Sequence, residues 1–108
     1  MLVRAAILTT TAGLWLFQSV FFEAVPKLPA PLQEPLTQRF AVDPYIWTEP
    51  AFSPFRRRYA LSHVLIVAGF GLWALVALPF RIGIATALAI VAGVGAVFLI
   101  YRLLRFGL

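Results

Sequence analysis

Three long apolar runs and one polar, proline-rich stretch set the pattern of hydrophobic and polar positions along the chain. The apolar runs cover about residues 2–22, 59–80 and 82–105. An α-helix of about 20 apolar residues is long enough to cross the roughly 30 Å hydrocarbon core of a bilayer. The pattern therefore predicts an all-α membrane protein, with three transmembrane helices in one membrane domain over residues 1–108.

The first run also has the basic start and apolar stretch of a cleaved secretory signal. Signal peptides end in small residues just before the cleavage site. A cut after Ala24 would place Phe22 at the third position before it, where a small residue is needed. We therefore expect residues 2–22 to be retained as a membrane span.

Residues 23–58 differ sharply from the runs on either side. They hold seven of the eight prolines and all four acidic residues. Proline removes a backbone donor and clashes with the preceding helical turn, so this density predicts a loop without a long helix. A short helix over about residues 31–40 is compatible with the prolines, with Pro31 in its first turn. The segment DPYIWTEP after it is expected to be extended chain and turns.

The second and third runs are separated only by the neighbourhood of Pro79, Phe80 and Arg81. Proline ends the earlier helix because it cannot continue the hydrogen-bond ladder. A connection this short makes the two helices antiparallel neighbours. We therefore expect a first span, a proline-rich loop and then a tight antiparallel hairpin formed by the last two helices.

The composition agrees with a membrane location. Hydrophobic residues make up 62% of the chain and charged residues 12%, against about 45–50% and about 25% in soluble domains. A soluble domain of this size has too little interior to bury so much apolar surface. A soluble enzyme and a disordered tail are therefore poor interpretations. The absence of cysteine also excludes disulfides and thiolate chemistry.

The net charge of +5 is better explained by orientation in a membrane than by nucleic-acid binding, because the basic residues flank the apolar runs. With three spans, Arg4 and Arg81 lie on one side. Because basic residues stay in the cytoplasm, we expect the loop and the C-terminus to be cytoplasmic and the N-terminus outside. The membrane would be a bacterial inner membrane or its organelle equivalent. The basic residues on the loop side are Lys27, Arg39, Arg56, Arg57, Arg58, Arg102 and Arg105.

Two clusters in the loop have the composition of contact sites. Arg56, Arg57 and Arg58 precede the second span. Each basic residue contributes roughly 1 kcal/mol near an anionic surface, so these three fit a headgroup anchor, or a specific site for anionic lipids or an acidic partner. Exposed aromatic clusters usually mark contact with protein or membrane. We expect such contact from four aromatic residues of the loop: Tyr45, Trp47, Phe52 and Phe55.

Small residues recur every four positions on two of the spans. Lipid provides no hydrophobic drive for helix pairing, so pairing depends on close backbone approach, which small residues permit. We therefore expect these faces to pack on other helices. They are Ala5, Thr9 and Gly13 in the first span, and Ala85, Ala89 and Gly93 in the third.

His63 is the one histidine and the one candidate ligand, about a turn inside the second span. A neutral imidazole there could ligate the metal of a haem or bacteriochlorophyll, or line a quinone site with Tyr45 and Trp47. The alternative is an interfacial histidine bonded to a headgroup, to Ser62 or to a partner. One histidine without cysteine makes no intrachain metal site, so we assign no metal ligands.

The second and third spans hold no ionisable group at depth of the kind that pumps and transporters use. The favoured hypothesis is a non-catalytic accessory subunit of a larger respiratory or photosynthetic electron-transfer complex. It would stabilise other membrane subunits by helix packing and loop docking. One alternative is a cofactor-binding subunit, with haem, bacteriochlorophyll or quinone near His63. Another is a homo-oligomeric pore or holin-like protein. An enzyme acting alone is not expected.

Overall fold

The computed structural model describes residues 1–107, except for the side chains of residues 36, 38 and 39. It contains three long helices, α1 (Leu2–Ala24), α3 (Ser53–Ala77) and α4 (Ile82–Phe106), and one shorter helix, α2 (Pro35–Thr48). Short 3-10 turns over Val25–Lys27, Ala30–Gln33 and Pro50–Phe52 lie in the connections. The described residues form no strand, and the predicted all-α fold is confirmed.

α1, α3 and α4 are each long and apolar enough to cross a membrane. They have 23, 25 and 25 residues, and a helix of that length spans roughly 35 Å at about 1.5 Å per residue. Many of their large apolar side chains, such as Leu8, Trp15 and Phe98, are exposed. Lipid tails solvate such surfaces without cost, so the chain is a membrane protein with three apolar spans.

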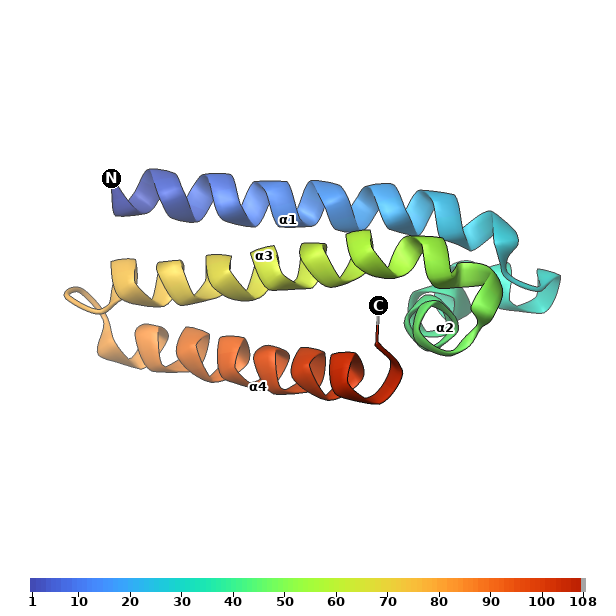
Figure 1. Ribbon diagram of the computed structural model, residues 1–108. Helices are drawn as coiled ribbons and strands as arrows, with labels where there is room; N and C mark the ends of the chain where they lie inside the picture. Colours follow the sequence, from blue (N-terminus) through green and yellow to red (C-terminus); the bar gives the residue numbers. More distant parts are fainter. Residues whose placement is uncertain (108) are drawn as a thin grey trace.

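The three long helices form a layer with α3 in the middle (Figure 1). α1 packs along one side of α3, and α4 runs back along the other side after the connection at residues 78–81. The N-terminus and this connection lie at one end of the layer, while α2 and the C-terminus lie at the other (Figure 1). This arrangement of the helices places most of the basic residues at the α2 end.

Close approach of α1 and α3 depends on two glycines. A Cβ added at Gly13 of α1 would stand 2.9 Å from the backbone nitrogen of Ile66 in α3. A Cβ added at Gly69 of α3 would stand 3.1 Å from the Cα atom of Thr10 in α1. Such short approaches bring the two backbones together and increase their dispersion contacts, which is how helices pair in lipid.

The proline-rich segment contains a longer helix than the sequence predicts. α2 begins at Pro35, where the missing backbone donor costs nothing, and continues through Pro44 to Thr48. The expectation of extended chain in DPYIWTEP is therefore wrong for residues 43–48. A proline inside a helix costs about 3 kcal/mol, but each large apolar side chain buried contributes about 1.5–3 kcal/mol. α2 buries three of them, at Val42, Ile46 and Trp47.

α3 also begins earlier than predicted. It starts at Ser53, six residues before the expected start of the second span at Tyr59, with a proline in its first turn. The Arg56–Arg58 run is therefore helical and belongs to α3 rather than to a loop. α2 is seen end-on in Figure 1, so it runs across the long axis of the layer and covers the end where α3 starts.

Replacing Gly69 tests the close approach of α1 and α3. We expect Gly69→Ala to lower the free energy of unfolding by about 1–3 kcal/mol, because the added methyl group overpacks against Thr10. Gly71→Ala is the matched control, since a Cβ at Gly71 meets nothing within 4 Å. The control should be neutral or stabilising by up to about 1 kcal/mol, because alanine favours helix over glycine. Unfolding of the purified chain in mixed SDS micelles, followed by circular dichroism, measures both. Equal effects would contradict the packing role of Gly69.

Candidate functional site

The largest group of buried apolar side chains lies at the α2 end, where all four helices contribute. Trp47, Phe52 and Phe55 are only 2%, 4% and 5% exposed. The interpretation of these aromatics as an exposed contact cluster is therefore wrong for all three. Tyr45 is half-buried, with its ring centroid 5.7 Å from that of Phe52. These rings pack within the chain because α2 folds back onto the ends of the long helices and covers them.

Asp43 of α2 joins three helices through its carboxylate. The hydroxyl of Tyr59 in α3 donates to Oδ1 at 2.8 Å, and a guanidinium nitrogen of Arg102 in α4 donates to Oδ2 at 2.8 Å. Tyr59 is buried and the other two groups are partly buried, so these charge-assisted bonds are stronger than an exposed ion pair would be. They hold α2 against α3 and α4 in one orientation.

The three consecutive arginines have different surroundings. Arg56 donates from Nε to the carbonyl of Ile46 at 2.7 Å, and from Nη2 to that of Glu49 at 3.4 Å. These carbonyls lie at the C-terminal end of α2, where the helix cannot satisfy its own acceptors. Arg58 forms an ion pair with Glu23 of α1. Arg57 is exposed, so it is the member of this run that we still expect to meet lipid headgroups or an acidic partner.

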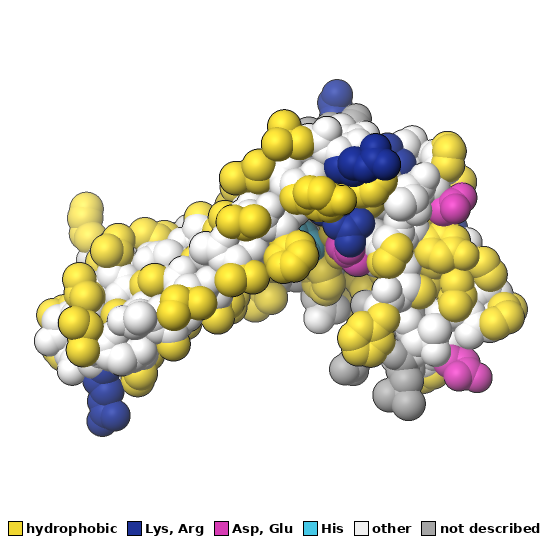
Figure 2. Space-filling model, turned by 90° about the horizontal axis from the view of Figure 1, so that it is seen from below, with side chains coloured by type: hydrophobic (Ala, Val, Ile, Leu, Met, Phe, Trp, Pro, Cys, Tyr) yellow, Lys and Arg dark blue, Asp and Glu magenta, His cyan; other side chains and the backbone are white. Residues whose placement is uncertain are grey.

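The α2 end carries further basic side chains over aromatic rings. Lys27 lies 5.0 Å from the Phe55 ring centroid, and the guanidinium of Arg58 lies 5.7 Å from the same centroid. Arg102 and Arg105 lie 5.8 Å and 5.7 Å from the centroid of Phe106. Cations at these positions gain from the negative faces of the rings while their charges stay close to water. Figure 2 shows basic side chains gathered at this end of the molecule.

His63 is held by its own helix and by two aromatic rings. Its Nδ1 atom lies 2.9 Å from the carbonyl oxygen of Tyr59, which also accepts a bond from the hydroxyl of Ser62 at 2.6 Å. The His63 ring centroid is 4.4 Å from that of Tyr59 and 5.8 Å from that of Phe17 in α1. A carbonyl oxygen only accepts hydrogen bonds, so Nδ1 carries the proton and the lone pair of a neutral ring lies on Nε2.

The six small residues that the sequence singles out divide between buried and open positions. Gly13 and Ala85 are buried within the chain, and Thr9 is half-buried. Ala5, Ala89 and Gly93 are exposed, and a Cβ added at Gly93 would meet nothing within 4 Å. α4 instead turns Ala85, Ala92 and Leu99 inward, at intervals of seven residues. The side of α4 that carries Ala89 and Gly93 is therefore left open by this chain.

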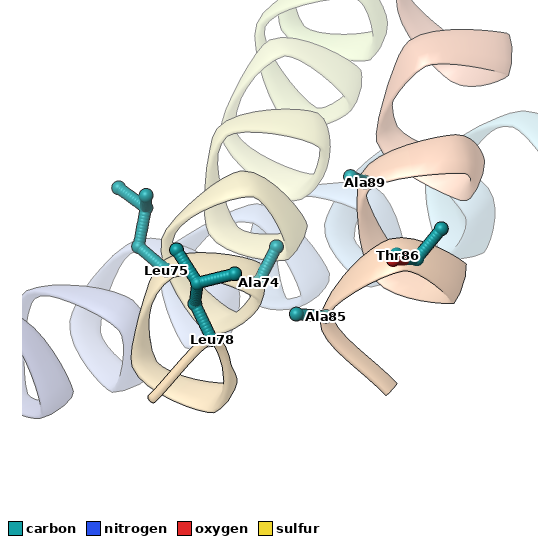
Figure 3. Close-up of a pocket in the computed structure, with 6 residues that line it drawn as sticks. All are labelled: Ala74, Leu75, Leu78, Ala85, Thr86 and Ala89. Atoms are coloured by element: carbon teal, nitrogen blue, oxygen red, sulfur yellow. The ribbon is translucent and has the colours of Figure 1, made fainter. Parts of the chain in front are cut away.

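An apolar groove of about 230 Å³ lies between α3 and α4, toward the end opposite α2 (Figure 3). The hydroxyl of Thr86 donates to the carbonyl of Ile82 at 2.8 Å, so its proton is not available to a ligand in the groove. It is suited to apolar contact with a neighbouring helix or an acyl chain. Its lining residues are Ala74, Leu75, Leu78, Ala85, Thr86 and Ala89.

Among the described residues, no three histidine, cysteine, aspartate or glutamate side chains come together to hold a metal ion. Comparison with protein-family models, curated proteins and solved structures gives no match.

The sequence interpretation did not find the Asp43–Tyr59–Arg102 group. Arg102 offered a signal, because a charged side chain near the end of an apolar span either reaches the interface or needs a polar partner. Asp43 lies 59 positions away along the chain, and no local pattern connects the two residues. Only the fold of α2 brings them together.

Removing the Asp43 carboxylate tests how α2 is held. We expect Asp43→Ala to lower the free energy of unfolding by about 2–3 kcal/mol, because Tyr59 and Arg102 lose a charged acceptor. Backbone amides of residues 35–48 should then exchange with deuterium faster than in the native chain. Glu34→Ala is the control, since Glu34 is exposed at the start of α2 and forms no side-chain cap. Similar exchange in both variants would show that Asp43 does not hold α2 in place.

Proposed function

We propose that the chain is a non-catalytic accessory subunit of a larger membrane complex, and that it stabilises neighbouring subunits by helix packing. We propose a respiratory or photosynthetic electron-transfer complex as the assembly. The observation that carries the proposal is the open arrangement of the membrane helices. α1 and α4 lie on opposite sides of α3 in a layer (Figure 1), and the buried core to which both contribute lies only at the α2 end.

The layer buries little of its own apolar surface. In the most apolar windows of the three spans, only 17%, 22% and 17% of the residues are buried within the chain. Lipid can cover most of such a surface, but it has no preference for small residues. Small residues on an exposed helix face favour another helix, because they let its backbone approach closely. Ala89 and Gly93 form such a face beside the groove between α3 and α4.

α2 supports the docking part of the proposal. Its inner side is fixed by Asp43 and by the buried Trp47. Phe40 on the same helix is 80% exposed. A rigid helix that presents an exposed aromatic side chain at the membrane surface is a suitable contact for a neighbouring subunit. We therefore propose that the outer side of α2, and not the buried aromatic cluster, docks on the neighbouring subunit.

We also propose an orientation, with the α2 end and the C-terminus in the cytoplasm of a bacterial cell or the equivalent organelle compartment. Its support is the unequal distribution of basic residues. The end with the N-terminus and the α3–α4 connection carries Arg4 and Arg81. The α2 end carries the larger number, among them Lys27, Arg57 and Arg105, as the positive-inside rule requires of a cytoplasmic side.

Two alanine-to-leucine variants test the accessory-subunit proposal. Ala89→Leu places a bulky side chain on the open small-residue face beside the groove, while Ala87→Leu makes the same change at another exposed position of α4. In mild-detergent extracts of native membranes, we expect the native chain and Ala87→Leu to migrate with a large coloured assembly on a native gel. Ala89→Leu should migrate mainly as the free chain. A native chain that migrates alone or as a colourless homo-oligomer would overturn the proposal and favour a pore.

Because the chain has no cysteine, single introduced thiols can test the orientation without background labelling. Phe80 lies in the α3–α4 connection and Ala30 lies near the α2 end, and both are exposed. In intact cells, a membrane-impermeant maleimide should label Phe80→Cys from outside. It should label Ala30→Cys only after the membrane is opened. The reverse pattern would show that the orientation is inverted.

A further inference from the structure

The molecule has a hollowed surface where α2 meets the membrane helices, and we call this place the inner corner. Figure 2 shows the α2 part projecting from the layer, with histidine, acidic and basic side chains visible where the two meet. The polar residues that the contacts place there are His63, Asp43, Tyr59 and Arg102. The accessory-subunit proposal uses Asp43 only to hold α2 and leaves His63 without a role.

The hydrogen bond of His63 determines which of its ring nitrogens is available. Nδ1 is directed back to the Tyr59 carbonyl of its own helix at 2.9 Å. Nε2 lies on the ring edge away from that carbonyl, and no described residue forms a hydrogen bond with it. A histidine that donates from one nitrogen to a backbone carbonyl and keeps the other free has the arrangement found in metal-ligating histidines.

Because Nε2 carries a lone pair and no proton, it can bind some kinds of ligand and not others. As a lone-pair nitrogen it cannot donate a hydrogen bond to the carbonyl of an oxidised quinone. A bare metal ion needs three or more protein ligands, and the described residues provide no such group. A metal tetrapyrrole brings four nitrogens of its own and needs only an axial ligand from the protein. One free imidazole nitrogen is therefore sufficient for this class of ligand.

The surroundings of His63 also suit an amphiphilic ring. The rings of Tyr59 and Phe17 fix the imidazole on two sides, which reduces the entropy lost when a metal binds. Toward the middle of the membrane, Val67 packs against Gly95 of α4, and Phe70, half-buried on the same side of α3 as His63, provides apolar contact. At the polar edge, Arg102 has five N–H donors, and its bond to Asp43 uses one guanidinium nitrogen. The remaining donors can bind a ring carboxylate.

From these observations, we propose that His63 is the axial ligand of a metal tetrapyrrole of the haem or bacteriochlorophyll class, bound at the inner corner. Nε2 of His63 coordinates the metal, the apolar side of α3 contacts the ring, and Arg102 faces its carboxylate edge. This inference does not depend on the accessory-subunit proposal. A chain that binds the tetrapyrrole but migrates alone would support the ligand site and overturn only the subunit role.

Titration of the full chain in nanodiscs with haemin tests the proposal, with empty nanodiscs as the blank. We expect the native chain to shift the Soret band of haemin. His63→Ala should bind haemin about 10- to 100-fold more weakly, the range typical of a disturbed metal site. Added imidazole should restore the band in this variant. Val64→Ala, a change at the next and exposed position, should bind like the native chain.

Metal-free protoporphyrin IX separates ligation from adsorption to the apolar surface. We expect the native chain and His63→Ala to bind it equally, because it has no metal to coordinate. His63→Phe is a second variant that keeps an aromatic ring between Tyr59 and Phe17, so it tests the ligand without removing the packing. It should lose the haemin band while its helical content stays unchanged. Equal haemin binding by the native chain and by His63→Phe, or no Soret shift with the native chain, would overturn the proposal.

Discussion

The carboxylate of Asp43 is the point on which the arrangement of the α2 end depends. It accepts hydrogen bonds from Tyr59 on α3 and from Arg102 on α4, both at 2.8 Å. A charged side chain near a low-dielectric region is costly unless its partners satisfy it. Here one carboxylate accepts from a phenol and from one nitrogen of a guanidinium, which reach it from different helices. The position of α2 across the layer, and with it the inner corner, follows from this contact together with the burial of Val42, Ile46 and Trp47.

The membrane layer depends on a different constraint. In lipid, helices gain little from hiding apolar side chains, so the side chains that permit close approach decide which surfaces pair. Gly13 and Gly69 provide this approach between α1 and α3. Ala85 and Ala92 provide a small-residue face on α4, toward α3. Lipid can solvate the remaining faces, so a three-helix layer can present small residues such as Ala89 and Gly93 outward.

The two proposals concern different surfaces of one molecule. The packing proposal concerns the side of α4 near the groove, at the end away from α2. The ligand proposal concerns His63 at the α2 end, where Nε2 forms no hydrogen bond with a described residue and carries the lone pair. Because the surfaces are separate, a change in one leaves the chemistry of the other intact. An accessory subunit that also held a tetrapyrrole would fit an electron-transfer complex both by its packing and by its bound ligand.

Hydropathy and helix length alone determined the three spans and the membrane location, because the cost of exposing so much apolar surface to water is set by composition. The sequence also identified His63, because the position of a single histidine near the end of a span can be recognised without knowing the tertiary structure. It could not assign the aromatics of the loop, because whether Trp47 or Phe55 is exposed depends on where α2 lies. It could not pair Asp43 with Arg102, because their contact joins distant parts of the chain. Local propensity and proline content predicted a loop at residues 43–48, and only tertiary burial, which outweighs the cost of Pro44, decided that this segment is a helix.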